Sequence, residues 1–150
     1  MPSSEITIEH LTKYSDEDAA GIGRLMPFLS EKLNDSPIPK DLLTDIISSP
    51  YHEQLVARIN GVIVGTATLN MLMGPAAGRV GYLEDFVTDP EARGKGVGSK
   101  LWDAMVEWCN EHQVVLEFTS KPTRIDAHRF YLSRGAVIRD TTVFRFNPNN

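Results

Sequence analysis

Residues Tyr82 to Trp102, YLEDFVTDPEARGKGVGSKLW, carry the strongest structural signals in the chain. The first half of this stretch is rich in bulky side chains that favour a β-strand. Asp89-Pro90 ends that strand, because proline cannot donate to a strand ladder. Glycines then alternate with other residues from 94 to 98, and the apolar spacing after them predicts a helix over 97–112. The sequence therefore places a glycine-rich turn between a strand and the start of a helix.

Such a turn has the chemistry of an anion site. The first N–H groups of a helix have no partner inside the helix, and the aligned peptide dipoles add partial positive charge there. Glycines let a ligand approach the backbone closely, and Arg93 and Lys95 add formal positive charge. We expect the turn to bind a phosphate or a pyrophosphate. The alternative is a glycine-rich helix start that binds no ligand.

Two common phosphate-binding patterns do not match this turn. The Walker pattern fails because Gly96 follows Lys95, and the dinucleotide pattern fails because Ser99 stands where a glycine is required. The spacing of Arg93, Gly96 and Gly98 instead resembles the acetyl-CoA pyrophosphate loop of the GNAT superfamily of N-acetyltransferases. The resemblance implies that acetyl-CoA is bound as a co-substrate by the end of the strand, the turn and one arginine further on: Phe86, Val87, Thr88, Arg93, Gly94, Lys95, Gly96, Val97, Gly98, Ser99 and Arg124.

A second segment carries the same resemblance. Residues 127–136, AHRFYLSRGA, look like the family's segment that closes the acetyl-CoA site, and this implies that Tyr131 protonates the departing CoA thiolate. A phenol can protonate such a leaving group. The alternative is that Tyr131 packs on the sheet. Arg124 departs from the asparagine that the family often uses to bond pantetheine, so it can reach a phosphate instead, and Ala136 replaces an aromatic residue.

The expected reaction also needs a proton acceptor. A primary amine with a pKa of about 10.4 is neutral only about once in 2,500 molecules at pH 7. By resemblance Glu84 is the first candidate base, through a water, and Asp85 is the second; only one of the two can face a cleft unless a bulge shifts the alternation. Either carboxylate could instead pair with Arg79 or another neighbour. The N–H group of Val87 is expected to bond the thioester oxygen.

Composition limits the function classes. The chain has 150 residues, which predicts one domain over 1–150, and its net charge of −5 argues against a nucleic-acid-binding surface. No apolar run is long enough to cross a membrane and no secretory signal is present, so we expect a cytoplasmic protein without a membrane partner. The single cysteine, Cys109, falls on the apolar face of a helix and is expected to pack in the core. The histidines have no metal-ligand spacing, so we expect no metal.

The order of elements predicts the fold class. We expect an α/β (α+β) fold with a mixed, largely antiparallel central sheet flanked by helices, in the order β-α-α-β-β-β-α-β-α-β. The GNAT fold uses the same order. Asn60-Gly61 predicts a hairpin, Gly65 a bulge or a close backbone approach, and Pro27 a break or kink in the first helix. The expected strands are 5–11, 52–59, 62–71, 79–88, 114–119 and 141–146, and the expected helices are 14–33, 41–48, 97–112 and 124–134.

We therefore expect an acetyl-CoA-dependent N-acetyltransferase that moves an acetyl group to a primary amine by direct attack on the thioester. The acceptor is expected to be a small cationic amine, since residues 82–86 and 130–136 look most like the diamine and polyamine branch of the family. A homodimer is also expected. The alternatives are an enzyme that acetylates a protein amino terminus or a lysine, and a non-catalytic acyl-CoA-binding module.

Overall fold

The computed structural model describes residues 5–150 of the chain, which form two compact units. The first unit ends at Phe118 and the second is Thr119–Asn150. The single domain expected from the chain length stays a prediction.

The first unit contains one five-stranded sheet in the order β1-β2-β3-β4-β5. The first three pairings are antiparallel, and β4 and β5 are parallel. The predicted fold class, a mixed and largely antiparallel sheet flanked by helices, is confirmed. The strands are β1 Ile6–His10, β2 His52–Ile59, β3 Val62–Gly74, β4 Gly78–Thr88 and β5 Leu116–Glu117.

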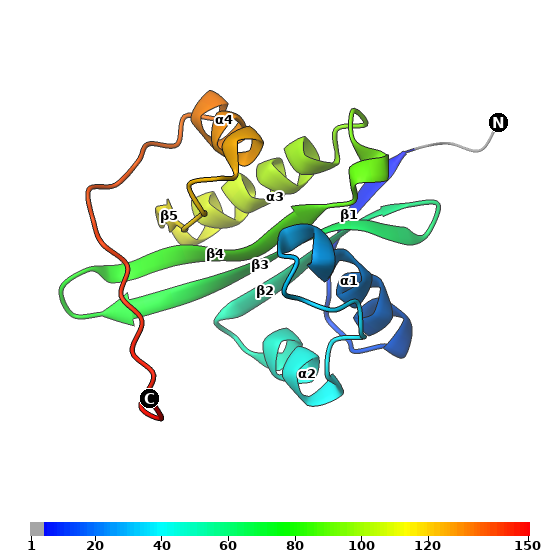
Figure 1. Cartoon of the computed structure of the whole chain (residues 1–150), viewed down its shortest axis with the longest axis horizontal. Helices are drawn as coiled ribbons and strands as arrows, with labels where there is room; N and C mark the ends of the chain where they lie inside the picture. The colour runs from blue at the N-terminus through cyan, green and yellow to red at the C-terminus, as the bar shows by residue number, and fades with distance from the viewer. Residues whose placement is uncertain (1–4) are drawn as a thin grey trace. The chain divides into compact units, whose positions relative to one another are not determined.

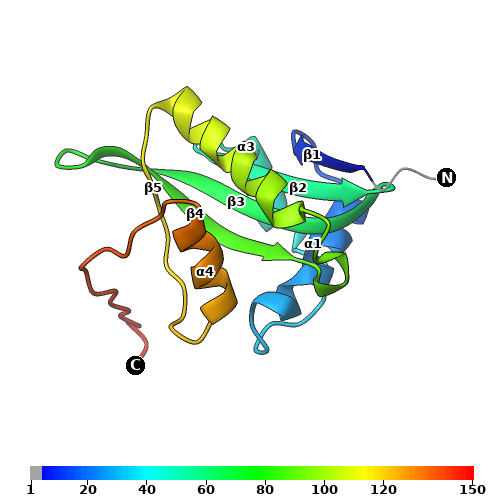
Figure 2. The same cartoon turned by 90° about the horizontal axis from the view of Figure 1, so that it is seen from above.

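Helices cover both faces of this sheet (Figure 1). Helices α1 (Asp16–Leu29) and α2 (Lys40–Ser48) lie on one face, and α3 (Val97–His112) lies on the other, as the view from above also shows (Figure 2). A single 3-10 turn, η1 (Pro90–Ala92), joins β4 to the loop before α3. The α1 face holds a core of buried apolar side chains: Leu11, Ala19, Ile22, Leu25, Leu43, Val56, Ile63 and Val87.

Two glycines let α3 lie close to its face of the sheet. A Cβ atom at Gly65 would stand 2.8 Å from the side chain of Val97, and one at Gly81 would stand 2.8 Å from Trp108. Both distances are shorter than real side chains tolerate, so any larger residue would push the helix away. Gly65 also follows Val64, an extra residue in β3 where the register with β2 shifts. Gly65 therefore marks both a bulge and a close approach, as expected.

Local signals in the sequence set several element boundaries. Asn60 and Gly61 have φ values of 52° and 80° and turn the β2–β3 hairpin as predicted. Ser15 caps α1 by accepting a hydrogen bond from the Asp18 N–H. The predicted end of that helix at residue 33 is wrong, since α1 stops at Leu29. Pro27 explains the early end, because it supplies no N–H group and crowds the preceding turn.

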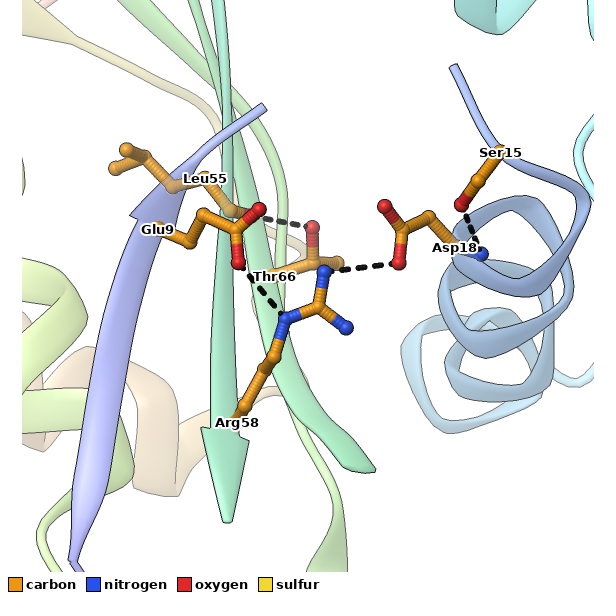
Figure 3. A network of polar contacts seen from close by, with 6 residues as sticks. All are labelled: Glu9, Ser15, Asp18, Leu55, Arg58 and Thr66. Atoms are coloured by element: carbon orange, nitrogen blue, oxygen red, sulfur yellow. Dashed lines mark hydrogen bonds and ion pairs between the residues drawn. The ribbon is translucent and has the colours of Figure 1, made fainter. Parts of the chain in front are cut away.

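One charged network ties three elements of the first unit together (Figure 3). Arg58 of β2 donates to Glu9 of β1 at 3.0 Å and to Asp18 of α1 at 2.8 Å. Arg58 and Asp18 are mostly shielded from solvent, whereas Glu9 is half-exposed. The ion pair between Arg58 and Asp18 thus fixes the start of α1 against the sheet.

The second unit contains one helix, α4 (Ile125–Ser133), which Gly135 terminates with a φ of 92°. The predicted last strand at 141–146 is wrong: this described segment has no regular secondary structure. Its apolar side chains are exposed, and Phe144 retains 88% of its accessible surface. Alternating apolar residues become a strand only where another strand supplies ladder partners, and none pairs with this segment. The strand predicted at 114–119 is likewise reduced to Leu116–Glu117.

Candidate active site

A bulge in β4 decides where the two candidate bases lie. Thr68 pairs with Glu84 and Thr66 pairs with Val87, so Asp85 and Phe86 together oppose a single residue of β3. Asp85 has a φ of 54°, a left-handed conformation that a bulge imposes on one of its residues. Without the bulge, residues 84 and 87 would face opposite sides of the sheet. With it, both lie on the face that α1 and α2 cover.

Glu84 is anchored from the neighbouring strand. The side-chain amide of Asn70 in β3 donates to Glu84 Oε2 at 3.4 Å, and Asn70 is itself buried. No ion pair joins Glu84 to Arg79 or to any other residue of the described chain. Glu84 is exposed, so its carboxylate remains accessible to a ligand or to water.

Asp85 is the other candidate base, and its environment differs. Burial of the carboxyl group raises the pKa of Asp85 above its ordinary value, although the residue as a whole is exposed. Burial does this because the charged form loses hydration. A carboxylate with a raised pKa is a stronger base, which suits Asp85 to proton transfer. Glu84 is suited to it by its accessibility and by the hydrogen bond that orients its carboxylate.

Within residues 5–150, no strand pairs with the last part of β4 on its β5 side. Strand β5 pairs with β4 only through Gly81–Leu116 and Tyr82–Glu117. From residue 83 to residue 88, β4 therefore has β3 as its strand neighbour on one side only. Backbone groups at such an edge can bond an extended ligand that carries amide groups. Phe86, Val87 and Thr88 lie on this part of the strand.

The predicted glycine-rich turn lies between η1 and α3. Gly94 and Gly96 have φ values of 80° and 86°, and a Cβ atom at either position would meet nothing within 4 Å. Gly96 is the N-cap of α3 and, unlike a serine or an aspartate, has no side chain that could accept a hydrogen bond from the first turn of the helix. Arg93 and Lys95 are exposed and form no ion pair in the described chain.

This geometry suits an anion such as a phosphate or a pyrophosphate. The turn is open, it is flanked by two cations, and it presents the amino-terminal end of a 16-residue helix to the anion. The strand, turn and helix predicted from residues 82–112 are thus present in order. Val97 is buried and anchors the helix start, whereas Gly98 and Ser99 lie in its first turn.

Two predicted site residues belong to the second unit. Tyr131 lies on α4, where its ring contacts Phe130 edge-on with 6.1 Å between the ring centroids. Burial raises the pKa of the Tyr131 phenol, and the positive charge of Arg124 offsets part of that rise. The phenol therefore stays protonated at neutral pH, as a proton donor must. Arg124 precedes the first residue of α4.

Sequence reasoning missed a row of buried polar side chains on the α1 face. Gln54 donates to Thr66 at 2.8 Å and accepts from Thr68 at 2.7 Å, and Asn70 continues the row to Glu84. These residues occupy alternate positions of β2 and β3 where apolar side chains are the norm. That departure from an apolar pattern was the available signal.

The rest of the described chain holds a further cavity and no candidate metal site. No group of three or more metal-ligating side chains is found in residues 5–150, and no helix there is long and apolar enough to span a bilayer. A cavity of about 350 Å³ lies at the carboxyl-terminal end of α3, where Trp108 and His112 line it together with Arg79 of β4. It is formed at the opposite end of α3 from the glycine turn.

Comparisons with known proteins agree with this geometry. The model of the acetyltransferase (GNAT) family matches residues 22–136. The chain is 31% identical over 142 residues to an aminoalkylphosphonate N-acetyltransferase of Salmonella typhimurium, covering 90% of this chain and 86% of that protein. An aminoglycoside acetyltransferase from an uncultured soil metagenomic sample superposes with a TM-score of 0.80 at 21% identity, covering 95% of both chains. A Bacillus halodurans protein described as a transcriptional regulator gives 0.81 at 21% identity, covering 95% of this chain and 99% of that one.

The fold and the strand–turn–helix arrangement define an acyltransferase of the N-acetyltransferase class. The chain belongs to the acetyltransferase (GNAT) family. The family and the enzyme class expected from the sequence are both confirmed.

Proposed function

We propose that this enzyme transfers the acetyl group of acetyl-CoA to a small primary amine by direct attack of the amine on the thioester. The proposal rests on four features that follow one another within residues 82–97: the β4 bulge, the unpaired strand edge, the glycine turn and the start of α3. Each of these features matches one part of a CoA thioester or of the reacting centre.

In this mechanism the turn binds the pyrophosphate and the open edge of β4 binds the pantetheine arm. The N–H groups of residues 94–98 and the cations Arg93 and Lys95 hold the phosphates. The amides of pantetheine bond backbone groups of residues 86–88, in the manner of an added strand. The N–H of Val87 donates to the thioester oxygen and to the oxyanion that forms when the amine attacks.

One of the two carboxylates beside the bulge removes the proton that the amine carries. Glu84 is the first candidate, acting through a water, and the hydrogen bond from Asn70 supports this role by fixing the carboxylate. Asp85 is the second candidate, and its raised pKa supports it. Tyr131 donates a proton to the CoA thiolate as the carbon–sulfur bond breaks, and its raised pKa suits a donor that stays protonated. The nitrogen, positively charged after the attack, loses its extra proton to water. The products are the N-acetylated amine and free CoA.

Two kinds of acceptor deserve a direct comparison. The sequence favours a small cationic amine such as a diamine. The Salmonella relative acts on an aminoalkylphosphonate, which carries an anionic group beside its amine. Both are small primary amines, and they differ in the charge at the other end of the molecule.

A matched panel of acceptors tests the proposal. Release of free CoA is measured with an aminoalkylphosphonate, a diamine of the same chain length, and an alkylamine that lacks both charged groups. A higher kcat/KM for the phosphonate or for the diamine assigns the acceptor charge. Release with a peptide amino terminus or a peptide lysine, and with none of the three small amines, would contradict the proposal. Binding of acetyl-CoA without turnover on any amine would contradict it as well.

A further inference from the structure

Arg24 of α1 makes one hydrogen bond to the residue after β4 and a second to β3. Its Nη1 donates to Asp89 Oδ2 at 2.9 Å, and its Nη2 donates to the backbone oxygen of Ile63 in β3 at 2.8 Å. One guanidinium thus joins a helix to two neighbouring strands. Arginine can do this because its donors form a planar fork, which a lysine ammonium cannot reproduce.

Asp89 is held at every polar group it has. Its side chain also accepts from the Glu91 N–H at 2.9 Å, its own N–H donates to Val64 at 2.8 Å, and its carbonyl accepts from Ala92 at 2.9 Å. The residue is only 7% exposed. Asp89 therefore fixes both the last rung of β4 and the single turn η1 that follows it.

The turn after η1 is held by backbone hydrogen bonds at its two ends: the Arg93 N–H donates to the Pro90 carbonyl at 3.2 Å, and the Gly96 carbonyl accepts from the Lys100 N–H at 3.0 Å. Gly94 and Gly96 contact nothing at the position of a Cβ atom, and Arg93 and Lys95 are exposed. The placement of residues 93–96 consequently depends on the two ends of the segment, which are Asp89 with η1 on one side and the buried Val97 on the other. Glycines add to this dependence because their backbone is otherwise free to move.

We propose that Arg24 and Asp89 form a positioning pair that holds the pyrophosphate turn for acetyl-CoA. Arg24 lies on the helix that covers the same sheet face as Glu84, so the pair joins the cofactor turn to the side of the sheet where the base lies. Neither residue touches the reacting atoms; each acts through the backbone of residues 90–96. The inference rests on the proposed function of the turn.

The test compares the variants Arg24→Met and Asp89→Asn with two thioesters. Acetyl-CoA carries the pyrophosphate, and S-acetylpantetheine carries the same acetyl thioester without it. The equilibrium Kd of acetyl-CoA should rise about tenfold or more in each variant, since a small misplacement of binding groups costs that much or more. The kcat/KM for S-acetylpantetheine should change by less than about threefold, because that substrate does not reach the turn.

The two residues should also act as one unit. The double variant should bind acetyl-CoA about as weakly as either single variant, since contacting residues are not additive. Arg24→Lys keeps the charge and should recover only part of the affinity. Arg58→Met is the matched control: it removes an ion pair between α1 and the sheet but touches none of residues 89–98, so it should leave the Kd for acetyl-CoA unchanged.

Two further outcomes separate this inference from the proposed function. If Gly96→Val weakens acetyl-CoA binding while Arg24→Met and Asp89→Asn do not, the turn binds CoA and the positioning pair is refuted. If Gly96→Val has no effect in a folded protein, the turn does not hold the pyrophosphate and the positioning pair is refuted with it, whereas acetyl transfer is tested separately by the acceptor panel. Equal losses with acetyl-CoA and with S-acetylpantetheine would show a general structural role and would also overturn the inference.

Discussion

Gly23 of α1 lies directly against the backbone of Ser36, so that a Cβ atom on Gly23 would overlap the Ser36 carbonyl oxygen. The connection between α1 and α2 crosses the helix at this point. It is tied there by the Ile38 N–H, which donates to the Ala19 carbonyl at 3.0 Å. The packing of this connection on α1 therefore requires a residue without a side chain.

Replacing Gly23 with alanine should lower the free energy of unfolding by about 1–3 kcal/mol, as overpacking usually does. Alanine is the better helix former, so propensity alone predicts a gain of about 1 kcal/mol. Urea denaturation measures the difference. Gly21→Ala is the control, because the nearest atoms to its Cβ would be those of the Ile63 side chain at 3.0 Å or more, a far milder contact than the overlap with the Ser36 oxygen. A Gly23→Ala protein as stable as the parent would show that the connection between α1 and α2 moves away from the helix at no cost in free energy.

Replacing Gly96 with valine should raise the Kd for acetyl-CoA about tenfold or more, since charge-assisted hydrogen bonds to the phosphates are lost. The φ of 86° is also strained for valine. Gly61→Val controls for that strain, because Gly61 has a φ of 80° and equally open surroundings in the β2–β3 hairpin. Isothermal titration decides: an unchanged affinity in folded Gly96→Val would remove the pyrophosphate from this turn.

The base should be visible in the pH dependence of kcat/KM. If Asp85 is the base, Asp85→Asn removes the acidic limb, and that limb lies above the ordinary range of an aspartate because burial raises the pKa of Asp85. If Glu84 is the base, Glu84→Gln removes the limb instead. Profiles are recorded for both variants with one amine. A parent-like profile in both variants would leave water as the proton acceptor.

Tyr131→Phe should lower kcat while leaving acetyl-CoA affinity nearly intact. The change keeps the ring and removes only the hydroxyl, and the loss of a general acid costs about 10²–10⁴-fold. The lower end is expected, because a CoA thiolate leaves without full protonation. Steady-state CoA release and a binding titration measure the two effects. An unaltered kcat would make Tyr131 a packing residue.

Acid should weaken the fold partly through Asp89. Burial acts to raise the pKa of Asp89, but the Glu91 N–H and the Arg24 guanidinium outweigh it, so the pKa lies below its usual value. A folded-state pKa below the unfolded one gives stability that is present above about pH 4 and is lost as the pH falls through the folded pKa. The difference in Tm between parent and Asp89→Asn should therefore shrink on acidification. A constant difference would contradict this.

Much of the fold could be predicted because local signals and the overall pattern agreed. Asn60-Gly61 set the hairpin, Ser15 began α1, and the bounds of β2 and α3 match those expected from apolar spacing. These features depend on backbone preferences of a few neighbouring residues, which a sequence displays directly. The same holds for the glycine turn, because its glycines predict the positive φ values and Arg93 and Lys95 give its charge.

The residue pattern was enough to predict the family, the strand–turn–helix order and the residues that we propose bind acetyl-CoA. Three further features depend on the folded chain: a bulge places Glu84 on the α1 face beside Asn70, Arg24 reaches Asp89 across 65 positions, and residues 141–146 form no strand. The physical reason is common to all three. Strand register, ion pairs and strand ladders each need a partner from a distant part of the chain. The conformational preferences of neighbouring residues do not specify which distant residue that partner is.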